Sequence, residues 1–132
     1  SIPQNQEGDF IKLSGNLFLN KKLLDFYLEI KNKKQVQLSI FTSAPINKND
    51  KLLKKHFSEF SNVFSTIPLG HSKNKPESFL LLSEKFGVDL ENSFFIDDQK
   101  NHVIAAKKAG LPAEQFISNQ EIINKLNNLC QL

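Results

Sequence analysis

Two adjacent acids, Asp97 and Asp98, come directly after an apolar run that ends at Ile96. Paired carboxylates at the end of a strand are typical ligands for a hard divalent cation such as Mg²⁺. Thr42 ends a second apolar run, and a hydroxyl in this position can bind a phosphoryl oxygen. A lysine near residue 74 would neutralise the charge that develops during phosphoryl transfer. These residue types indicate phosphate chemistry if the fold brings them together.

The same residues also have ordinary explanations. Acids at the start of a helix accept hydrogen bonds from its first N–H groups and interact favourably with its dipole. A threonine at a strand end and lysines in a loop are common in proteins without any site. The elements that surround these residues decide which explanation applies.

Strand and helix patterns alternate along the chain, which predicts an α/β fold. Expected strands cover residues 10–13, 36–41, 63–69, 93–96 and 116–117, and expected helices cover 23–30, 52–60, 76–86, 103–109 and 122–129. We expect a Rossmann-like three-layer sandwich in which a central parallel sheet carries helices on both faces. In such sheets, sites form beyond the carboxyl ends of the strands, where Thr42, Asp97 and Asp98 all lie.

Length and composition fit a globular protein of one domain. The chain has 132 residues, of which 39% are hydrophobic and 23% are charged. We expect a flexible lead over residues 1–8 and a single domain over residues 9–132. No apolar run is long enough to cross a bilayer. The one cysteine, Cys130, excludes zinc sites built on cysteine pairs and favours a reducing, cytoplasmic compartment.

The charge of the chain disfavours a nucleic acid as partner. The net charge is +3, and all 17 basic residues are lysines. Without arginine the chain lacks the forked donor that binds phosphate or guanine through two hydrogen bonds. We therefore interpret the positive charge as a solvated surface.

The segment FLLLSEKFGVDLENSFFIDDQKNHVIAAKKAGL, residues 79–111, contains a helix, a Gly-Val-Asp turn, a strand, the acid pair and an alanine-rich helix. This order resembles the haloacid dehalogenase (HAD) superfamily. LSIFTS, residues 38–43, resembles the second motif of that family, with Thr42 in the phosphate-contacting position. By its spacing from the start of the first segment, Lys73 falls on the family's lysine, and Lys75, which precedes a proline, is the alternative.

The resemblance implies that Asp98 is the direct Mg²⁺ ligand and that Asp97 lies beside it. After the acid pair, many members of the family have three residues and then an asparagine. Here His102 stands in that position, and Asn101 comes one residue early. His102 can still donate a hydrogen bond, although it departs from the family's pattern.

The first motif departs further from the family. KLSGNL, residues 12–17, is the best match to the family's Asp-x-Asp-Gly-Thr-Leu, in which the two aspartates are the nucleophile and the general acid/base. Lys12 and Ser14 occupy these two positions. A lysine cannot form an aspartyl-phosphate, and a serine is a poor general acid/base. Asp9 would lie at the other end of the strand and on its opposite face, so it is a poor substitute.

The loss of the nucleophile's carboxylate also removes a metal ligand. The Lys12 ammonium would take the place of the cation between Asp97 and Asp98, because two close carboxylates favour a cation between them. We therefore expect the binding of Mg²⁺ to be weak or absent.

Three functions stay open. The first is a HAD-like protein without its nucleophile, which acts as a non-catalytic binding or regulatory module. The second is a Mg²⁺-dependent phosphatase or other hydrolase with a non-standard first motif. The third is a phosphate or anion-binding module formed by Thr42, Lys73 and Lys12.

The spacing of the motifs leaves no room for a cap domain. Capless relatives have open sites, so the resemblance implies an exposed cleft and a protein or other macromolecule as partner. The sequence identifies neither a particular partner nor a substrate or an oligomeric state.

Overall fold

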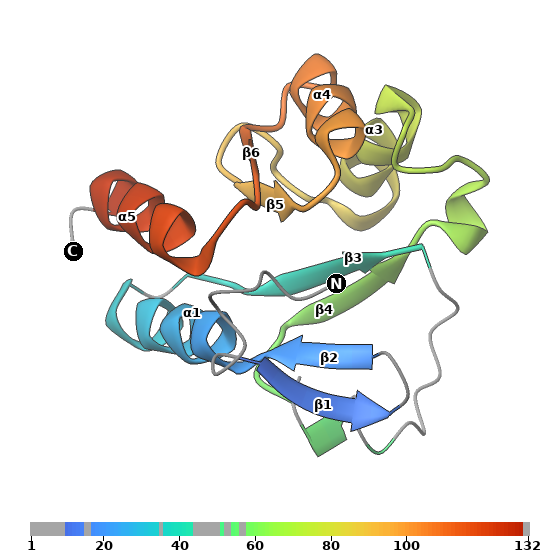
Figure 1. Cartoon of the computed structure of the whole chain (residues 1–132). Coiled ribbons are helices and arrows are strands. Elements are labelled where there is room, and N and C mark those ends of the chain that lie inside the picture. Colours follow the sequence, from blue (N-terminus) through green and yellow to red (C-terminus); the bar gives the residue numbers. More distant parts are fainter. Residues whose placement is uncertain are drawn as a thin grey trace. The chain divides into compact units, whose positions relative to one another are not determined.

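A computed structural model of the chain describes residues 10–14, 17–34, 36–43, 51, 54–55 and 58–130, with the backbone alone for residues 10–14, 17–19 and 130 (Figure 1). The chain forms two compact units. Unit 1 comprises residues 1–39, 47–62 and 117–132, and unit 2 comprises residues 40–46 and 63–116.

Among the described residues, unit 1 contains a pair of strands and the helices α1 (Lys21–Lys34) and α5 (Asn119–Cys130). Strands β1 (Phe10–Ser14) and β2 (Leu17–Asn20) pair in the antiparallel direction (Figure 1). Helix α1 follows β2 and packs against helix α5. The buried apolar residues of these two helices are Leu23, Leu24, Ile30, Ile122 and Leu126.

One side chain links the starts of the two helices of unit 1. Asn20 Oδ1 accepts a hydrogen bond of 3.1 Å from the backbone N–H of Leu23, which caps the first turn of α1. The amide nitrogen of the same side chain donates a hydrogen bond of 2.7 Å to Asn119 Oδ1 at the start of α5. Asn119 is buried, and this bond satisfies part of its polar side chain.

Unit 2 alternates strands and helices and contains the ends of the strands that matter for the site. Its elements are β3 (Ser39–Thr42) and β4 (Asn62–Ser65), which both begin in unit 1, then the 3₁₀ turn η2 (Ile67–Leu69), α3 (Pro76–Phe86), β5 (Phe95–Asp97), α4 (Lys100–Lys108) and β6 (Ala113–Gln115). Strands β5 and β6 are parallel, and α4 packs on both. Strand β3 pairs with β4, and because Leu38 O accepts from Ser61 N–H and Thr42 O from Thr66 N–H, these strands also run in one direction.

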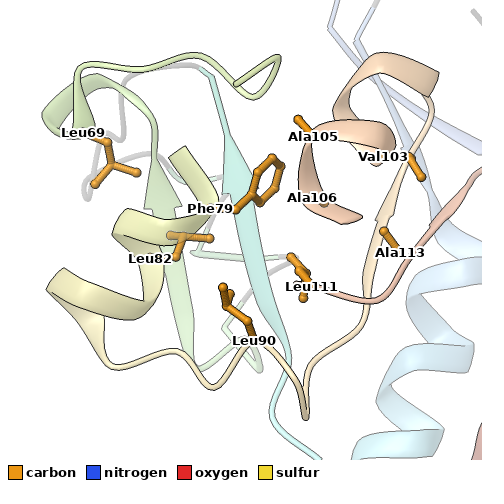
Figure 2. Packing of buried hydrophobic residues seen from close by; sticks show 9 residues of the cluster. All are labelled: Leu69, Phe79, Leu82, Leu90, Val103, Ala105, Ala106, Leu111 and Ala113. Atoms are coloured by element: carbon orange, nitrogen blue, oxygen red, sulfur yellow. The ribbon is translucent and has the colours of Figure 1, made fainter. Parts of the chain in front are cut away.

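The core of unit 2 lies between α3, α4 and the strands. Figure 2 shows nine of its buried side chains, with Phe79 and Leu82 from α3 and Val103, Ala105 and Ala106 from α4. The Phe79 ring makes edge-to-face contacts with the rings of Phe41 and Phe95, at centroid distances of 5.5 Å and 5.0 Å. Full burial of such a side chain stabilises a fold by roughly 1.5–3 kcal/mol. The core therefore fixes β3 and β5, whose ends carry Thr42 and Asp97.

The α/β class is confirmed, with parallel strands and with helices at four of the five expected places. Hydrogen bonds among the described strands join them as three pairs. Gly87 and Gly110, which directly follow the helices expected over 76–86 and 103–109, have φ of +71° and +91°, a conformation that glycine adopts without strain. No helix among the described residues is long and apolar enough to span a membrane.

Several boundaries differ from the expectation. Residues 67–69 form a 3₁₀ turn rather than the end of a strand, because Pro68 has no N–H to donate to a ladder. Residues 17–20 form β2, where we expected no strand. The last strand comes three residues earlier than residues 116–117, although Phe116 N–H still donates to Asp97 O.

Some expectations fall beyond the described residues. Most of the helix expected over residues 52–60 and the whole lead over residues 1–8 lie outside them. The single domain over residues 9–132 stays a prediction.

Candidate functional site

Asp97 is the centre of the site in unit 2. It is the last residue of β5, and its side chain is 7% exposed. Its Oδ2 accepts a hydrogen bond of 3.0 Å from Lys73 Nζ and lies 3.1 Å from His102 Nδ1. Its Oδ1 accepts a hydrogen bond of 2.8 Å from the backbone N–H of Gln99. Three protein donors therefore hold both oxygens of this carboxylate.

These donors determine the charge of Asp97. Burial alone would raise the pKa of its carboxyl group, because a low-dielectric environment disfavours the charged form. The hydrogen bond from Gln99 N–H, the ammonium of Lys73 and the hydrogen bond from His102 outweigh burial and lower the pKa below its ordinary value. Asp97 is therefore a carboxylate at neutral pH.

Lys73 is held from two further sides. Its ammonium donates a hydrogen bond of 3.2 Å to the carbonyl oxygen of Phe41 and lies 5.8 Å from the centroid of that residue's ring. The side chain of Lys73 is only 12% exposed. Lys75, the alternative lysine, is exposed and precedes the first residue of α3. Of the two lysines, Lys73 is thus the one that contacts Asp97, and its role as the lysine of the site stays a prediction.

Thr42 lies at the same strand end. It directly follows Phe41, and its carbonyl oxygen accepts a hydrogen bond of 3.0 Å from Thr66 N–H. Because Lys73 is bound to both Phe41 O and Asp97, the carboxyl ends of β3 and β5 meet at this lysine, as the sequence predicted. The contact of Thr42 with a phosphate stays a prediction.

Asp98 has a different environment from its neighbour. Its side chain is exposed, and no described residue donates a hydrogen bond to its carboxylate. Its backbone oxygen accepts a hydrogen bond of 3.1 Å from the side-chain amide of Gln115. Of the two adjacent acids, Asp98 is thus the one whose carboxylate is open to a ligand from solvent.

Lys12 and Ser14 belong to unit 1, where they lie in β1 opposite Phe18 and Leu17. Their side chains lie outside the described part of the chain, as does Asp9. Their assignment to the nucleophile and acid/base positions therefore stays a prediction.

The described residues do not fit a resident Mg²⁺ ion. Within this part of the chain, no three side chains of His, Cys, Asp or Glu are grouped so that they could hold a metal. Both oxygens of Asp97 already accept hydrogen bonds from protein groups, which leaves Asp98 as one open carboxylate. Mg²⁺ needs six oxygen ligands in near-octahedral geometry, and a single carboxylate supplies few of them. The role of Asp97 and Asp98 as ligands stays a prediction.

The structure adds contacts that the sequence did not reveal. The side-chain amide of Asn101 donates a hydrogen bond to Asn74 Oδ1, which ties the loop around Lys73 to the first turn of α4. The sequence gives a hint of this pair, since Asn74 directly follows Lys73 and Asn101 directly precedes His102. The carbonyl of Phe41 has no such signal, because every residue carries one.

Comparison with known proteins gives a family and a set of similar folds. A family model described as haloacid dehalogenase-like hydrolase matches residues 2–110. No curated protein matches the chain. Among solved structures, a protein assigned as a beta-phosphoglucomutase from Thermotoga maritima aligns with a TM-score of 0.68 and 23% identity, over 86% of this chain and 62% of that one.

Two further structures are similar. An uncharacterized protein from Corynebacterium glutamicum aligns with a TM-score of 0.69 and 17% identity, over 86% of this chain and 84% of that one. A HAD-family enzyme from Bacteroides thetaiotaomicron, a mutant in complex with magnesium and inorganic phosphate, has a TM-score of 0.52 and 19% identity, over 70% of this chain and 50% of that one. At these identities the similarity concerns the fold. The chain also spans less than two thirds of the first and third of these structures.

Proposed function

Because the chain belongs to the haloacid dehalogenase-like hydrolase family, we propose that it is a member that binds a ligand or partner without hydrolysing it. One observation carries the proposal: protein donors already occupy both oxygens of the buried Asp97 carboxylate. The sequence supports it as well, because Lys12 and Ser14 stand where the family has its two aspartates.

The chemistry explains why these features weigh against turnover. A covalent mechanism needs one carboxylate as nucleophile and a second group as general acid/base. Asp97 accepts hydrogen bonds from Lys73 and from the start of α4, which disperse its charge and make it a weak nucleophile. Asp98 alone cannot fill both roles. The chain would therefore retain the family's fold as a binding or regulatory module, whose partner would be a protein or another macromolecule.

A Mg²⁺-dependent hydrolase is the second candidate, and the open carboxylate of Asp98 favours it. Such an enzyme would have to obtain its nucleophile from a part of the chain outside the described residues or from another polypeptide. The related enzyme from Bacteroides thetaiotaomicron, in complex with magnesium and inorganic phosphate, makes this candidate worth testing.

An anion-binding module is the third candidate. The ammonium of Lys73 and the strand end at Thr42 lie together, and both residue types bind phosphate oxygens. Stabilisation of the protein by inorganic phosphate without Mg²⁺ would favour this candidate over the first.

The deciding measurement is the release of phosphate from a panel of phosphate esters in the presence of Mg²⁺. We expect the wild-type protein and the variant Asp98→Asn to give the same background rate. A Mg²⁺-dependent phosphatase in parallel reactions controls for the assay. Turnover by the wild type that disappears in Asp98→Asn would overturn the proposal and establish the second candidate.

A further inference from the structure

His102 is a buried polar residue whose effect on Lys73 the proposed function does not use. It lies in the first turn of α4, and its side chain is 9% exposed. Its Nδ1 is 3.1 Å from Asp97 Oδ2, the same oxygen that accepts a hydrogen bond from Lys73. An imidazole in this place thus contacts the carboxylate that holds the lysine.

The chemistry of the contact fixes which ring nitrogen carries a proton. A carboxylate only accepts hydrogen bonds, so the Nδ1 of His102 must be the donor. The carboxylate plane of Asp97 then has three anchors, at Oδ2 from His102 and Lys73 and at Oδ1 from Gln99 N–H. Rotation of this carboxylate would break all three bonds together. Removal of His102 leaves Oδ2 with Lys73 alone.

The neighbour of His102 holds the other end of the lysine segment. The side chain of Asn101 donates to Asn74 Oδ1, one residue after Lys73. Two consecutive residues of α4 therefore support Lys73. Asn101 binds the loop that follows Lys73, and His102 contacts the Asp97 carboxylate that accepts a hydrogen bond from it. A histidine that only filled space in the core would need neither the contact with Asp97 nor a neighbour bound to the loop of Lys73.

We infer that His102 is a positioning residue that orients the ammonium of Lys73 through the Asp97 carboxylate. An ammonium has three N–H donors, and Phe41 O and Asp97 Oδ2 accept two of them. With both acceptors fixed, the third N–H points in one direction and is presented to an oxyanion. This inference concerns the order of the site and holds whether or not the chain hydrolyses phosphate esters.

The test compares His102→Asn with His102→Leu. Asparagine keeps an N–H donor about as far from the backbone as Nδ1, whereas leucine keeps bulk and removes the donor. His71→Leu is the matched control, since His71 is an exposed histidine two residues before Lys73. The measurement is the exchange of the Lys73 ammonium protons with water by ¹⁵N NMR, with the signal assigned by its loss in Lys73→Gln.

We expect slow exchange in the wild type, in His102→Asn and in His71→Leu, and exchange about tenfold faster in His102→Leu, the effect of losing one net hydrogen bond. Unchanged exchange in His102→Leu with an intact amide spectrum would overturn the inference. So would equal acceleration in both His102 variants, because bulk rather than the donor would then matter.

A measurement on the wild type covers the case in which His102→Leu does not fold. The histidine ring spectrum of the wild type must show a proton on Nδ1 of His102. A ring protonated on Nε2 alone cannot donate to Asp97, and that result would also overturn the inference. Neither measurement depends on phosphate release, so failure of the proposed function would be seen separately.

Discussion

Asp97 and Asp98 are adjacent acids with opposite environments. The β-strand places consecutive side chains on opposite faces, so at the end of β5 one carboxylate turns toward Lys73 and His102 while the next reaches solvent. The charge of Asp97 is stabilised by protein donors, and the carboxylate of Asp98 has no donor among the described residues. The two acids are therefore suited to different tasks: Asp97 organises the lysine, and Asp98 is available to a ligand.

The lowered pKa of Asp97 predicts how stability depends on pH. An unfolded aspartate has a pKa of about 3.9, and the folded value lies below it. Above the unfolded value both states are ionised, so the Asp97 interactions contribute fully. As the pH falls, the unfolded state binds its proton first, and the contribution is lost as the pH passes through the folded pKa.

Asp97→Asn should therefore lower the free energy of unfolding at pH 7 by about 2 kcal/mol, the scale of hydrogen bonds to a buried charged group. The difference from wild type should shrink below pH ~4. Urea denaturation from pH 7 to pH 3 measures both effects. The exposed neighbour provides the control, since Asp98→Asn should stay within roughly 0.5 kcal/mol of wild type. A deficit of Asp97→Asn that is constant over this pH range would contradict the prediction.

Among the elements, α3 and α4 do most to place the site. Alanines 105 and 106 of α4 are buried, and their small side chains let the helix approach β5 and β6 closely. On α3, Phe79 is fully buried against the rings of Phe41 and Phe95. Phe41 carries the carbonyl that binds Lys73, and Phe95 begins the strand that ends at Asp97. Packing of one helix therefore sets the ends of two strands.

Two neighbouring residues of α3 test this role of packing. Phe79→Ala should lower the free energy of unfolding by about 3–5 kcal/mol, because it removes a buried ring and leaves a cavity. Leu80→Ala is the matched control on the exposed side of the helix: its side chain is 48% exposed, so the loss should be well under half of that for Phe79→Ala. Similar losses in the two variants, measured by urea denaturation, would show that burial on α3 does not govern its stability.

At the scale of the whole molecule, the sequence predicted the features that local periodicity and helix stops determine. The helix over 76–86 and the glycine stops have the expected positions because apolar spacing and proline or glycine chemistry act locally. The meeting of Lys73 with Asp97 was predictable only from the family's motifs. The hydrogen bond from Lys73 to Phe41 O and the contact of His102 with Asp97 were not predictable, because they depend on three-dimensional proximity that no spacing rule encodes.

The β2 strand shows why a local pattern can mislead. Residues 17–20 read Leu-Phe-Leu-Asn, an apolar segment that fits a strand and the approach to a helix equally well. Pairing with β1 decides between them, and the apolar pattern of residues 17–20 does not encode that pairing. The two-unit division is similarly non-local, since each unit collects segments that are far apart in the chain.

That interleaving predicts how the whole chain unfolds. Neither unit is a continuous segment, and β3 and β4 each contribute residues to both. Unfolding of unit 2 therefore breaks strands that unit 1 also uses, so we expect one cooperative transition. Tyr27 in α1 of unit 1 is the only tyrosine, and the chain has no tryptophan, so tyrosine fluorescence reports on unit 1 alone.

Phe79→Ala changes unit 2, but it should also lower the urea concentration at which the fluorescence of Tyr27 in unit 1 changes. The transition seen by far-UV circular dichroism should fall to the same urea concentration. Ile122→Ala provides the reciprocal change, because Ile122 is fully buried in unit 1, and it should also move both transitions together. A Tyr27 transition that stays at its wild-type midpoint in Phe79→Ala, while the circular dichroism divides into two steps, would mean that the units fold independently. In that case a change in the core around Phe79 would alter the site at Asp97 without disturbing β1, and the roles predicted for Lys12 and Ser14 would have to be tested apart from it.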